Sequence, residues 1–456
     1  MTDHSTAIND PALDKSARLA ALQSLAAEAP ECLFRDFNRT SAEINNHIHT
    51  FYSFSPYSPS MAALLAMKAE LGAAGSVDHD SIAAAEEMLA ACAILGIGGC
   101  VGFEVRVSFK TGVDGKESPF AARKMNNPDS RGYAYMTVQG IPRQSIRKAA
   151  EFLTPVRAER LERTRAMTVS SNAMLREAGF PEIDFENDII AKSKYVEGGG
   201  ITERHLLAAM AEKIIQKFGQ GPRLAEWLKS KMAMSFSPKL GALLSDPGNP
   251  HYLYDLLGVL KAGFLPEIYI QPDEKECIPA ERVTAFAKSI AAIPAYPYLG
   301  DVGESPTGDK KAEKFEDDYL EELFAEIYRL GYHAFTYMPP RNTHAQLSRV
   351  RKLSAEWGFM EISGVDINSS RQSFNCPEVL MDGFRHLLDT TWALIAHERF
   401  ASVDERYGLF STANPVAQMK LPERLSFYAG LGRKFDLHHP DESAAVLVGE
   451  IDKGNT

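Results

Sequence analysis

Short apolar runs alternate with longer amphipathic segments along most of this chain, and this alternation predicts repeated strand–helix units. Leucines and alanines at helical spacing between residues 19 and 26 predict an amphipathic helix after a polar, acidic tail. From residue 44 onward we expect a strand into 47–49, a helix over 61–71, a strand over 73–77, a helix over 81–95 and a strand over 99–107. Repeated strand–helix order produces a parallel sheet, so the pattern predicts the α/β class.

Two segments interrupt this order. Residues 110–130 are rich in glycine, asparagine and proline, which predicts a long loop over the site. Residues 143–262 carry helical patterns rich in Ala, Leu, Lys and Glu, and we expect them to form an inserted helical region. The strand pattern then returns, with strands expected over 264–270, 290–300, 334–338 and 359–365, helices over 317–330 and 342–357, and closing helices over 377–440.

Imidazoles and carboxylates stand where several of these strands end, which is how a barrel collects metal ligands at one rim. His47 and His49 are two residues apart, so on a strand they point to the same side and can share one cation. An isolated pair of this kind can also be two loop histidines satisfied by hydrogen bonds. Here a further histidine and two carboxylates follow at later strand ends, which favours the metal site.

The next two clusters lie at 78–80 and 102–104. A carboxylate on either side of His79 is well placed to orient the second nitrogen of that imidazole, and Asp80 is also expected to cap the following helix. Glu104 falls inside a buried strand, where an unpaired carboxylate is costly, so it needs a metal or another cation. We expect Arg106 to point the opposite way on the strand and therefore not to be that partner.

The last cluster follows the predicted strand 359–365. Asp366 is a carboxylate at the end of an apolar run, and Asn368 falls on the same face of the chain. The alternative is an Asx turn that caps the next helix. Because this cluster comes last in a series that opens with two histidines, we predict that Asp366 closes the site.

The order of these motifs resembles the PHP (polymerase and histidinol phosphatase) family of metal-dependent phosphoesterases over most of residues 44–370. The resemblance is carried by HxHT at 47–50, DHD at 78–80, GxE at 102–104, Gly-Val-Asp-x-Asn at 364–368 in place of Gly-Ser-Asp-x-His, and Thr-Glu-Arg-His at 202–205, similar to a Thr-Arg-Pro-His stretch of many members. It implies a distorted (β/α)7 barrel whose ligands sit at the carboxyl ends of the strands.

With that resemblance the chain divides into five parts. We expect an N-terminal tail and helix (1–40), a first part of the barrel (41–142), the helical insertion (143–262), a second part of the barrel (263–376) and a C-terminal helical extension (377–456).

Four positions depart from the family pattern. They are occupied by Phe54 with its serine neighbours, Tyr135, Tyr296 and Asn368. The departures make a trinuclear cluster doubtful, and we expect one or two divalent cations, with Zn, Mn and Fe not distinguished by N and O ligands. The predicted metal ligands are His47, His49, His79, Glu104 and Asp366, with Asp301 and Asn368 as replacements.

Other residues are candidates for binding substrate and moving protons. Cations at predicted rim positions are Arg204, Lys310, Arg341 and Arg371. Each alone is a solvated surface charge, but two or three that converge can clamp a phosphate or carboxylate. Asp301 can equally cap a turn. We predict catalytic roles for His79, His205 and Asp366, with His205 or His79 protonating the leaving oxygen.

Composition excludes several other classes. The chain has 456 residues with a net charge of −11 and no basic run, so an extended nucleic-acid surface is not expected. Five cysteines without CxxC spacing predict free thiols in a reducing, cytoplasmic compartment. No signal-like N-terminus and no run of roughly 18 apolar residues is present, so no membrane association is expected. The expected partner is a small phosphorylated or otherwise anionic substrate, and a homo-oligomer is compatible with the sequence.

The leading hypothesis is therefore a metal-dependent phosphoesterase that cleaves a small phosphorylated metabolite. Two alternatives stay open. One is an amidohydrolase-like hydrolase or isomerase of a carboxylate-bearing substrate, and the other is a catalytically silent PHP-type module that binds a ligand or partner.

Overall fold

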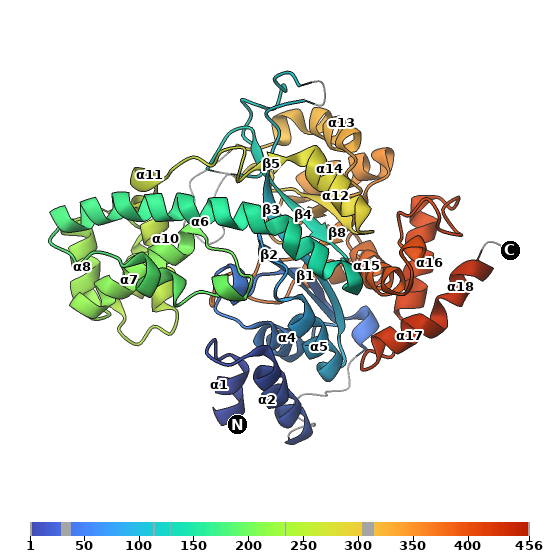
Figure 1. Cartoon of the computed structure of the whole chain (residues 1–456), viewed down its shortest axis with the longest axis horizontal. Coiled ribbons are helices and arrows are strands. Elements are labelled where there is room, and N and C mark those ends of the chain that lie inside the picture. The colour runs from blue at the N-terminus through green and yellow to red at the C-terminus, as the bar shows by residue number, and fades with distance from the viewer. Residues whose placement is uncertain are drawn as a thin grey trace.

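A computed structural model describes residues 2–28, 38–112, 115–127, 129–232, 234–302 and 314–454 of the chain. A central sheet is flanked by the inserted helices on one side and by the C-terminal helices on the other (Figure 1). The strands are β1 (Ile44–Ile48), β2 (Ala73–His79), β3 (Gly98–Ser108), β4 (Tyr133–Gln139), β5 (Ile278–Pro279), β6 (Ile293–Pro297), β7 (Ala334–Tyr337) and β8 (Met360–Ser363).

Seven of these strands form a nearly closed barrel. Their order is β1-β2-β3-β4-β6-β7-β8, and the short β5 pairs with β3 outside this path. Neighbouring strands are parallel except around β4, which is antiparallel to both β3 and β6. A bridge between Ile48 and Ile367 links β1 to the segment after β8. The predicted α/β barrel is thus confirmed.

The strands around the site are buried along most of their length, with only His79 at the end of β2 partly exposed. All eleven residues of β3 are buried, as expected for a sheet whose two faces are covered. The helices that cover the barrel are α4 (Pro59–Lys68), α5 (Ala85–Leu95), α12 (Ala280–Ser289), α13 (Leu320–Leu330), α14 (His344–Trp357) and α15 (His386–Val403). The predicted alternation of strands and helices therefore holds for most of the barrel.

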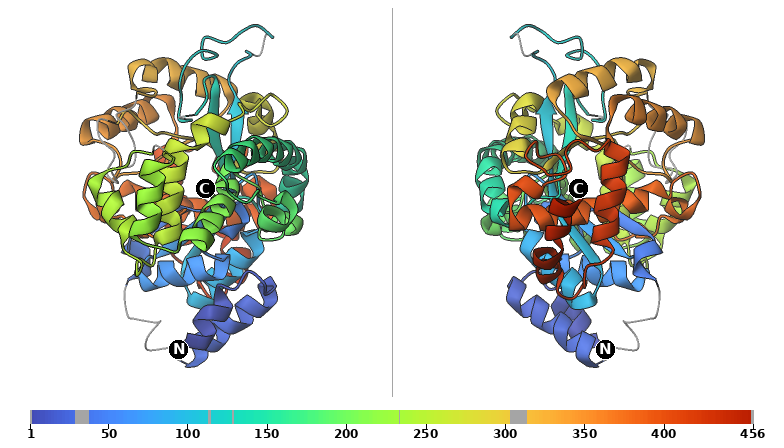
Figure 2. Two further views of the ribbon diagram at one scale, coloured as in Figure 1. Left: turned by 90° about the vertical axis from the view of Figure 1, so that its left-hand side faces the viewer. Right: turned by 90° about the vertical axis from the view of Figure 1, so that its right-hand side faces the viewer.

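The inserted helices have a hydrophobic core of their own. Buried side chains from residues 167 to 268 form one cluster, separate from the cluster of the barrel and the terminal helices. Figure 2 shows this group facing the viewer in its left view. Its helices are α6 (Ile146–Glu177), α7 (Glu203–Phe218), α8 (Pro222–Ser230), α9 (Pro238–Ser245), α10 (Tyr252–Gly263) and α11 (Leu265–Ile268).

The two ends of the chain add helices to the barrel core. These are α1 (Thr2–Ile8) and α2 (Lys15–Glu28) at the N-terminus, and α16 (Leu421–Gly432), α17 (Pro440–Leu447) and α18 (Gly449–Lys453) at the C-terminus. The buried Arg18 of α2 reaches Glu87 of α5 through two hydrogen bonds of 3.0 and 2.6 Å. This buried ion pair attaches the N-terminal helices to the barrel.

Three elements differ from the sequence-based expectations. The predicted strand 264–270 contains the helix α11, because Pro266 can occupy a first helical turn and the apolar side chains join the core of the insertion. The seventh barrel strand is instead β4, which follows the predicted loop 110–130 and was not predicted. The polar N-terminal tail also contains a helix that was not predicted, α1.

The described part of the chain contains no helix that combines the length and the apolar character required to cross a bilayer. Cys92, Cys100, Cys277 and Cys376 are buried free thiols, as predicted. Cys32 lies outside the described residues.

Candidate metal centre

Four predicted ligands meet where β1 and β2 end, beside the middle of β3. His47 and His49 project from the end of β1, and His79 ends β2 directly beside Glu104 in the β2–β3 register. His47 Nε2 lies 3.7 Å from Glu104 Oε1, His49 Nε2 lies 3.9 Å from Glu104 Oε2, and His79 Nδ1 lies 2.9 Å from the same Oε2. Glu104 is therefore the centre of the cluster.

Asp366 reaches this cluster from the far edge of the sheet. The backbone of Ile367 exchanges hydrogen bonds with His47 and His49, of 3.1 and 2.9 Å, and so carries the preceding carboxylate toward β1. Asp366 Oδ1 lies 3.4 Å from His49 Nε2 and accepts a hydrogen bond of 2.7 Å from the Asn368 amide. The Asp366 side chain is 37% exposed, so solvent reaches the cluster from this side.

The arrangement fits a divalent cation. Ligand atoms of His47, His49 and Glu104 all lie within 4.8 Å of one another. Tetrahedral ligands at about 2.0–2.1 Å from one ion lie roughly 3.3 Å apart, close to the separations observed. The buried His49 Nε2 faces Glu104 and Asp366 but makes no hydrogen bond with the described residues. Burying such atoms unpaired is costly, and a cation would supply the missing partner.

The electrostatics of the site favour the forms that bind metal. Burial lowers the pKa of His49 to about 3, so its imidazole is neutral, as a ligand must be. Burial, followed by the charge of Arg160, lowers the pKa of His79 to about 3. Burial would raise the pKa of Asp366, but electrostatic interactions with His49, His47 and Arg204 outweigh it and lower the pKa to about 2, where His49 is itself protonated.

Glu104 shows the cost of leaving this site without a cation. Burial raises the pKa of its carboxyl group, because a carboxylate there loses its hydration. A divalent ion on Glu104 would favour the ionised form instead.

The carboxylates beside His79 do not orient it as the sequence suggested. Asp78 accepts hydrogen bonds from Thr50 and Ser53 of the β1 loop, each of 2.6 Å. Asp80 accepts one of 2.5 Å from Arg160 of α6. The helix after Asp80 begins only at residue 85, and its N-cap makes no side-chain hydrogen bond. The two carboxylates therefore join neighbouring segments to the rim.

Asp80 belongs to a buried ion cluster that the sequence did not predict. Its members are the arginines 106, 160 and 163 and the acids Asp80, Glu203 and Glu276, all less than a tenth exposed. Arg106 lies 3.0 Å from Glu203 and 3.2 Å from Glu276, and Arg163 lies 2.6 Å from Glu203. Three positive and three negative charges balance, which allows their burial.

One signal for this cluster was present in the sequence. Arg106 follows Glu104 by two residues, so both side chains face the same side of β3. The expectation that Arg106 points the opposite way from Glu104 was therefore wrong, because residues two apart on a strand share a face. Arg106 is paired with Glu203 and Glu276.

A glycine run brings the insertion to the rim. A Cβ at Gly200 would lie 2.7 Å from the backbone oxygen of His79, so only glycine permits this approach. The start of α7 follows, and Arg204 donates a hydrogen bond of 3.1 Å to the backbone oxygen of Asn368. Thr202 N–H donates a hydrogen bond of 3.0 Å to His205 Nδ1.

His205 is also held by packing and electrostatics. Its ring lies 4.9 Å from that of Phe54, measured between centroids. Burial, with the charge of Arg160, lowers its pKa to about 3, so the imidazole is neutral. Phe54 itself has a φ of 72°, an uncommon value for a residue with a side chain. Such strain is concentrated at functional sites.

The two substituted tyrosines have different surroundings. The Tyr135 ring lies 5.4 Å from that of His79, and its hydroxyl accepts a hydrogen bond of 3.1 Å from Arg106. Tyr296 instead packs 5.5 Å from Phe335, which stacks on Phe324 of α13. Tyr296 therefore lies in the layer between the sheet and the outer helices.

The remaining predicted residues are engaged away from the histidine cluster. Asp301 accepts a hydrogen bond of 2.6 Å from Phe315 N–H, Arg341 donates one of 3.0 Å to the backbone oxygen of Leu299, and Arg371 pairs with Asp255 of α10 at 2.6 Å. Lys310 lies outside the described residues. Roles in binding metal or substrate stay predictions for these four.

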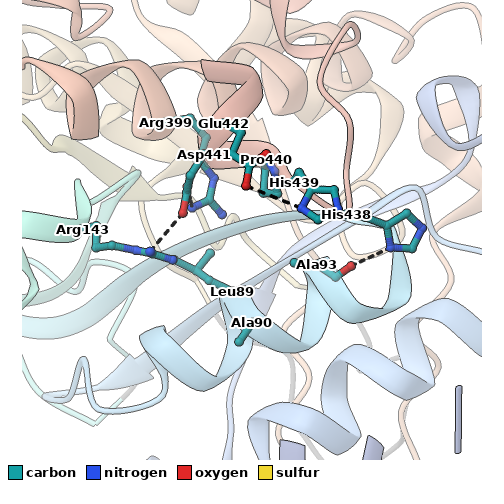
Figure 3. Close-up of a pocket in the computed structure, with 10 residues that line it drawn as sticks. All are labelled: Leu89, Ala90, Ala93, Arg143, Arg399, His438, His439, Pro440, Asp441 and Glu442. Atoms are coloured by element: carbon teal, nitrogen blue, oxygen red, sulfur yellow. Dashed lines mark hydrogen bonds and ion pairs between the residues drawn. The ribbon is translucent and has the colours of Figure 1, made fainter. Parts of the chain in front are cut away.

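A small cavity of about 180 Å³ lies apart from this site, between α5, α15 and the start of α17 (Figure 3). Arg143 and Arg399 line it, and each pairs with Asp441 at 3.0 Å. None of the candidate metal ligands lines this cavity.

No family model and no curated protein matches this chain. Among solved structures, an amidohydrolase from Chromobacterium violaceum with bound sulfate and no metal is similar, with a TM-score of 0.46, 16% identity, and coverage of 76% of this chain and 96% of that one. A candidate metal-dependent phosphoesterase from Bifidobacterium adolescentis has a TM-score of 0.47, 17% identity, and coverage of 76% and 95%.

Proposed function

We propose that this chain is a divergent PHP-type enzyme, a metal-dependent hydrolase that cleaves a small phosphorylated substrate. The observation that carries the proposal is the set of His47, His49 and Glu104, whose ligand atoms lie within 4.8 Å of one another. The buried His49 Nε2 faces the carboxylates of Glu104 and Asp366 without a hydrogen-bond partner among the described residues, as expected for a site built to hold a cation.

We expect the residues of the candidate site to have different roles. His47, His49 and Glu104 would hold the ion, with Asp366 and His79 beside it. When bound, a divalent cation supplies Lewis acidity toward a phosphoryl oxygen and lowers the pKa of water. The partial exposure of Asp366 leaves this side of the cluster open to substrate.

The start of α7 would bind the substrate anion and its leaving oxygen. Arg204 lies beside Asn368 at the Asp366 side of the site, where a guanidinium can pair with phosphate. His205 accepts the Thr202 N–H at Nδ1, so the hydrogen of the neutral ring is on Nε2. From there it can donate a hydrogen bond to the leaving oxygen.

Metal analysis of protein purified without added ions, combined with a substrate panel, tests the proposal. We expect stoichiometric metal and turnover of a phosphomonoester, cyclic phosphate or nucleotide that disappears in His49→Ala. Tyr296→Phe, a change in the outer aromatic layer, should keep both properties. Metal with turnover only of carboxylate-bearing amides would contradict phosphoester cleavage, and absence of metal would contradict the enzyme and favour a binding module.

A further inference from the structure

Asp78 organises the loop that follows β1 through three hydrogen bonds. Its Oδ1 accepts from the Thr50 backbone N–H and from the Ser53 hydroxyl, and its Oδ2 accepts from the Thr50 hydroxyl, each at 2.6 Å. All three groups are buried. An ionised carboxylate has no hydrogen to donate, so both Asp78 oxygens act as acceptors and each of the two hydroxyls donates.

The hydrogen bonds of Ser53 then determine the tautomer of His49. A serine hydroxyl has one hydrogen, and Ser53 uses it on Asp78. His49 Nδ1 lies 3.3 Å from the same hydroxyl oxygen, so Nδ1 must be the donor and the oxygen the acceptor. In a neutral imidazole the other nitrogen then carries a bare lone pair. That nitrogen is Nε2, which faces Glu104 and Asp366 at 3.9 and 3.4 Å.

From this chain of contacts we infer that Asp78 and Ser53 are positioning residues that hold His49 as the Nδ1–H tautomer, with Nε2 presented to a cation. The inference rests on the proposed metal centre. The opposite tautomer would place an N–H between the ring and the two carboxylates and would leave no lone pair for a metal. Groups that orient a ligating imidazole in this way increase metal affinity.

The sequence offers a matched control two residues away. Ser55 is buried like Ser53, but its hydroxyl makes no hydrogen bond with the described residues. Ser53→Ala and Ser55→Ala therefore remove the same atom from the same loop, and only the first removes a contact with His49.

The first experiment records the imidazole nitrogens of the full-length, metal-free protein by 15N NMR with labelled histidine. The signals of His49 are assigned by their absence from the spectrum of His49→Ala. We expect them to show the ring hydrogen on Nδ1. In Ser53→Ala this preference should weaken, and in Ser55→Ala it should persist. A hydrogen on Nε2 of the wild type would overturn the inference. Because no metal is present, this result does not depend on the proposed function.

The second experiment measures Zn²⁺ affinity by competition with a chelator. Ser53→Ala should weaken binding by about 10–100-fold, as expected for the loss of a group that orients a ligand. Ser55→Ala should match the wild type, and Ser53→Thr, which keeps the hydroxyl, should retain most of the affinity. Equal affinities for Ser53→Ala and Ser55→Ala would contradict the inference. If the wild type binds no Zn²⁺, the proposed metal centre fails while the NMR result still decides the tautomer.

Discussion

The two halves of the barrel are built from different chemistry. Strands β1 to β3 direct His47, His49, His79 and Glu104 toward one point, with the buried ion cluster beside them. Strands β6 and β7 direct aromatic rings toward the outer helices, and Phe335 stacks on Phe324 at 4.5 Å. Charge organises the first half, and aromatic packing organises the second.

This difference explains how the candidate ligands can gather although four positions depart from the pattern that the sequence resembles. The second half contributes one carboxylate, Asp366, and it does so because Ile367 bridges back to Ile48 and closes the barrel. The substituted Tyr296 lies on the far side of its strand, among aromatic rings. The candidate centre therefore depends on β1 to β3 and on the closing bridge rather than on the whole rim.

The largest expected effect comes from removing the central carboxylate. Glu104→Gln keeps the shape of the side chain but removes the charge that faces three imidazoles, at 2.9 to 3.9 Å. We expect Zn²⁺ affinity to fall by at least about 100-fold, the upper range for loss of even an outer-shell group. Chelator competition measures this loss.

Tyr296→Phe provides the counterpart from the second half and should leave Zn²⁺ affinity unchanged. If Tyr296→Phe weakened binding as much as Glu104→Gln, the division between the halves would be wrong.

The next largest effect is expected from the buried ion cluster of arginine and acidic side chains beside the site. Arg163 is buried between Glu203 and Glu276, and Arg163→Met would leave their charges partly uncompensated. We expect the free energy of unfolding to fall by about 3–5 kcal/mol, as for other buried pairs that lose one partner. Arg165→Met is the control on the same helix, because its pair with Glu186 is exposed and should contribute about 0–1 kcal/mol. Urea unfolding measures the loss of stability in both variants, and equal losses would contradict the prediction.

The sequence predicted the first half of the barrel better than the second. Each ligand of β1 to β3 could be predicted from the local sequence. The signals are a spacing of two on a strand for His47 and His49, a position at a strand end for His79 and a charge inside an apolar strand for Glu104. The number of barrel strands was also correct, although one strand was misplaced. The apolar run at 264–270 was too short to separate strand from helix by periodicity, and the core of the insertion made it helical.

The partners of the buried charged side chains could not be predicted from the local sequence pattern. Asp78 flanks His79 in sequence, yet its hydrogen bonds go to Thr50 and Ser53, more than 20 residues earlier. Arg160 and Glu203 lie in the insertion and meet Asp80 only after the chain folds. Such pairings depend on tertiary packing, which no spacing rule specifies.

A smaller effect is expected from Glu316, a buried acid in the second half. Burial raises the pKa of Glu316 to about 8, despite backbone hydrogen bonds from residues 299 and 300 that lower it. The folded protein therefore holds this proton more tightly than the unfolded chain. The stability gained is complete below the ordinary pKa of 4.5 and is lost as pH rises toward 8.

Glu316→Gln removes this titration, so the melting temperature of the variant should fall less between pH 5 and pH 8 than that of the wild type. We expect the two curves to diverge by at least roughly 2 °C, the shift per kcal/mol in domains of moderate size. Thermal unfolding across this pH range measures the difference, and parallel curves would show that Glu316 is ionised throughout.

The smallest effect tests whether the second half depends on ring packing rather than on polar groups. Tyr332 is buried before β7, and its hydroxyl makes no hydrogen bond with the described residues. Tyr332→Phe keeps the ring and removes an unsatisfied oxygen, so stability should change by less than about 1 kcal/mol, in the stabilising direction. Tyr428→Phe is the control, because that buried hydroxyl accepts from Asn414 and donates to the Tyr407 backbone oxygen, both at 2.6 Å. Its removal should cost about 1–3 kcal/mol, since Asn414 and Tyr407 lose a partner. A comparable loss in Tyr332→Phe would mean that a polar contact, and not the aromatic surface alone, supports the second half of the barrel.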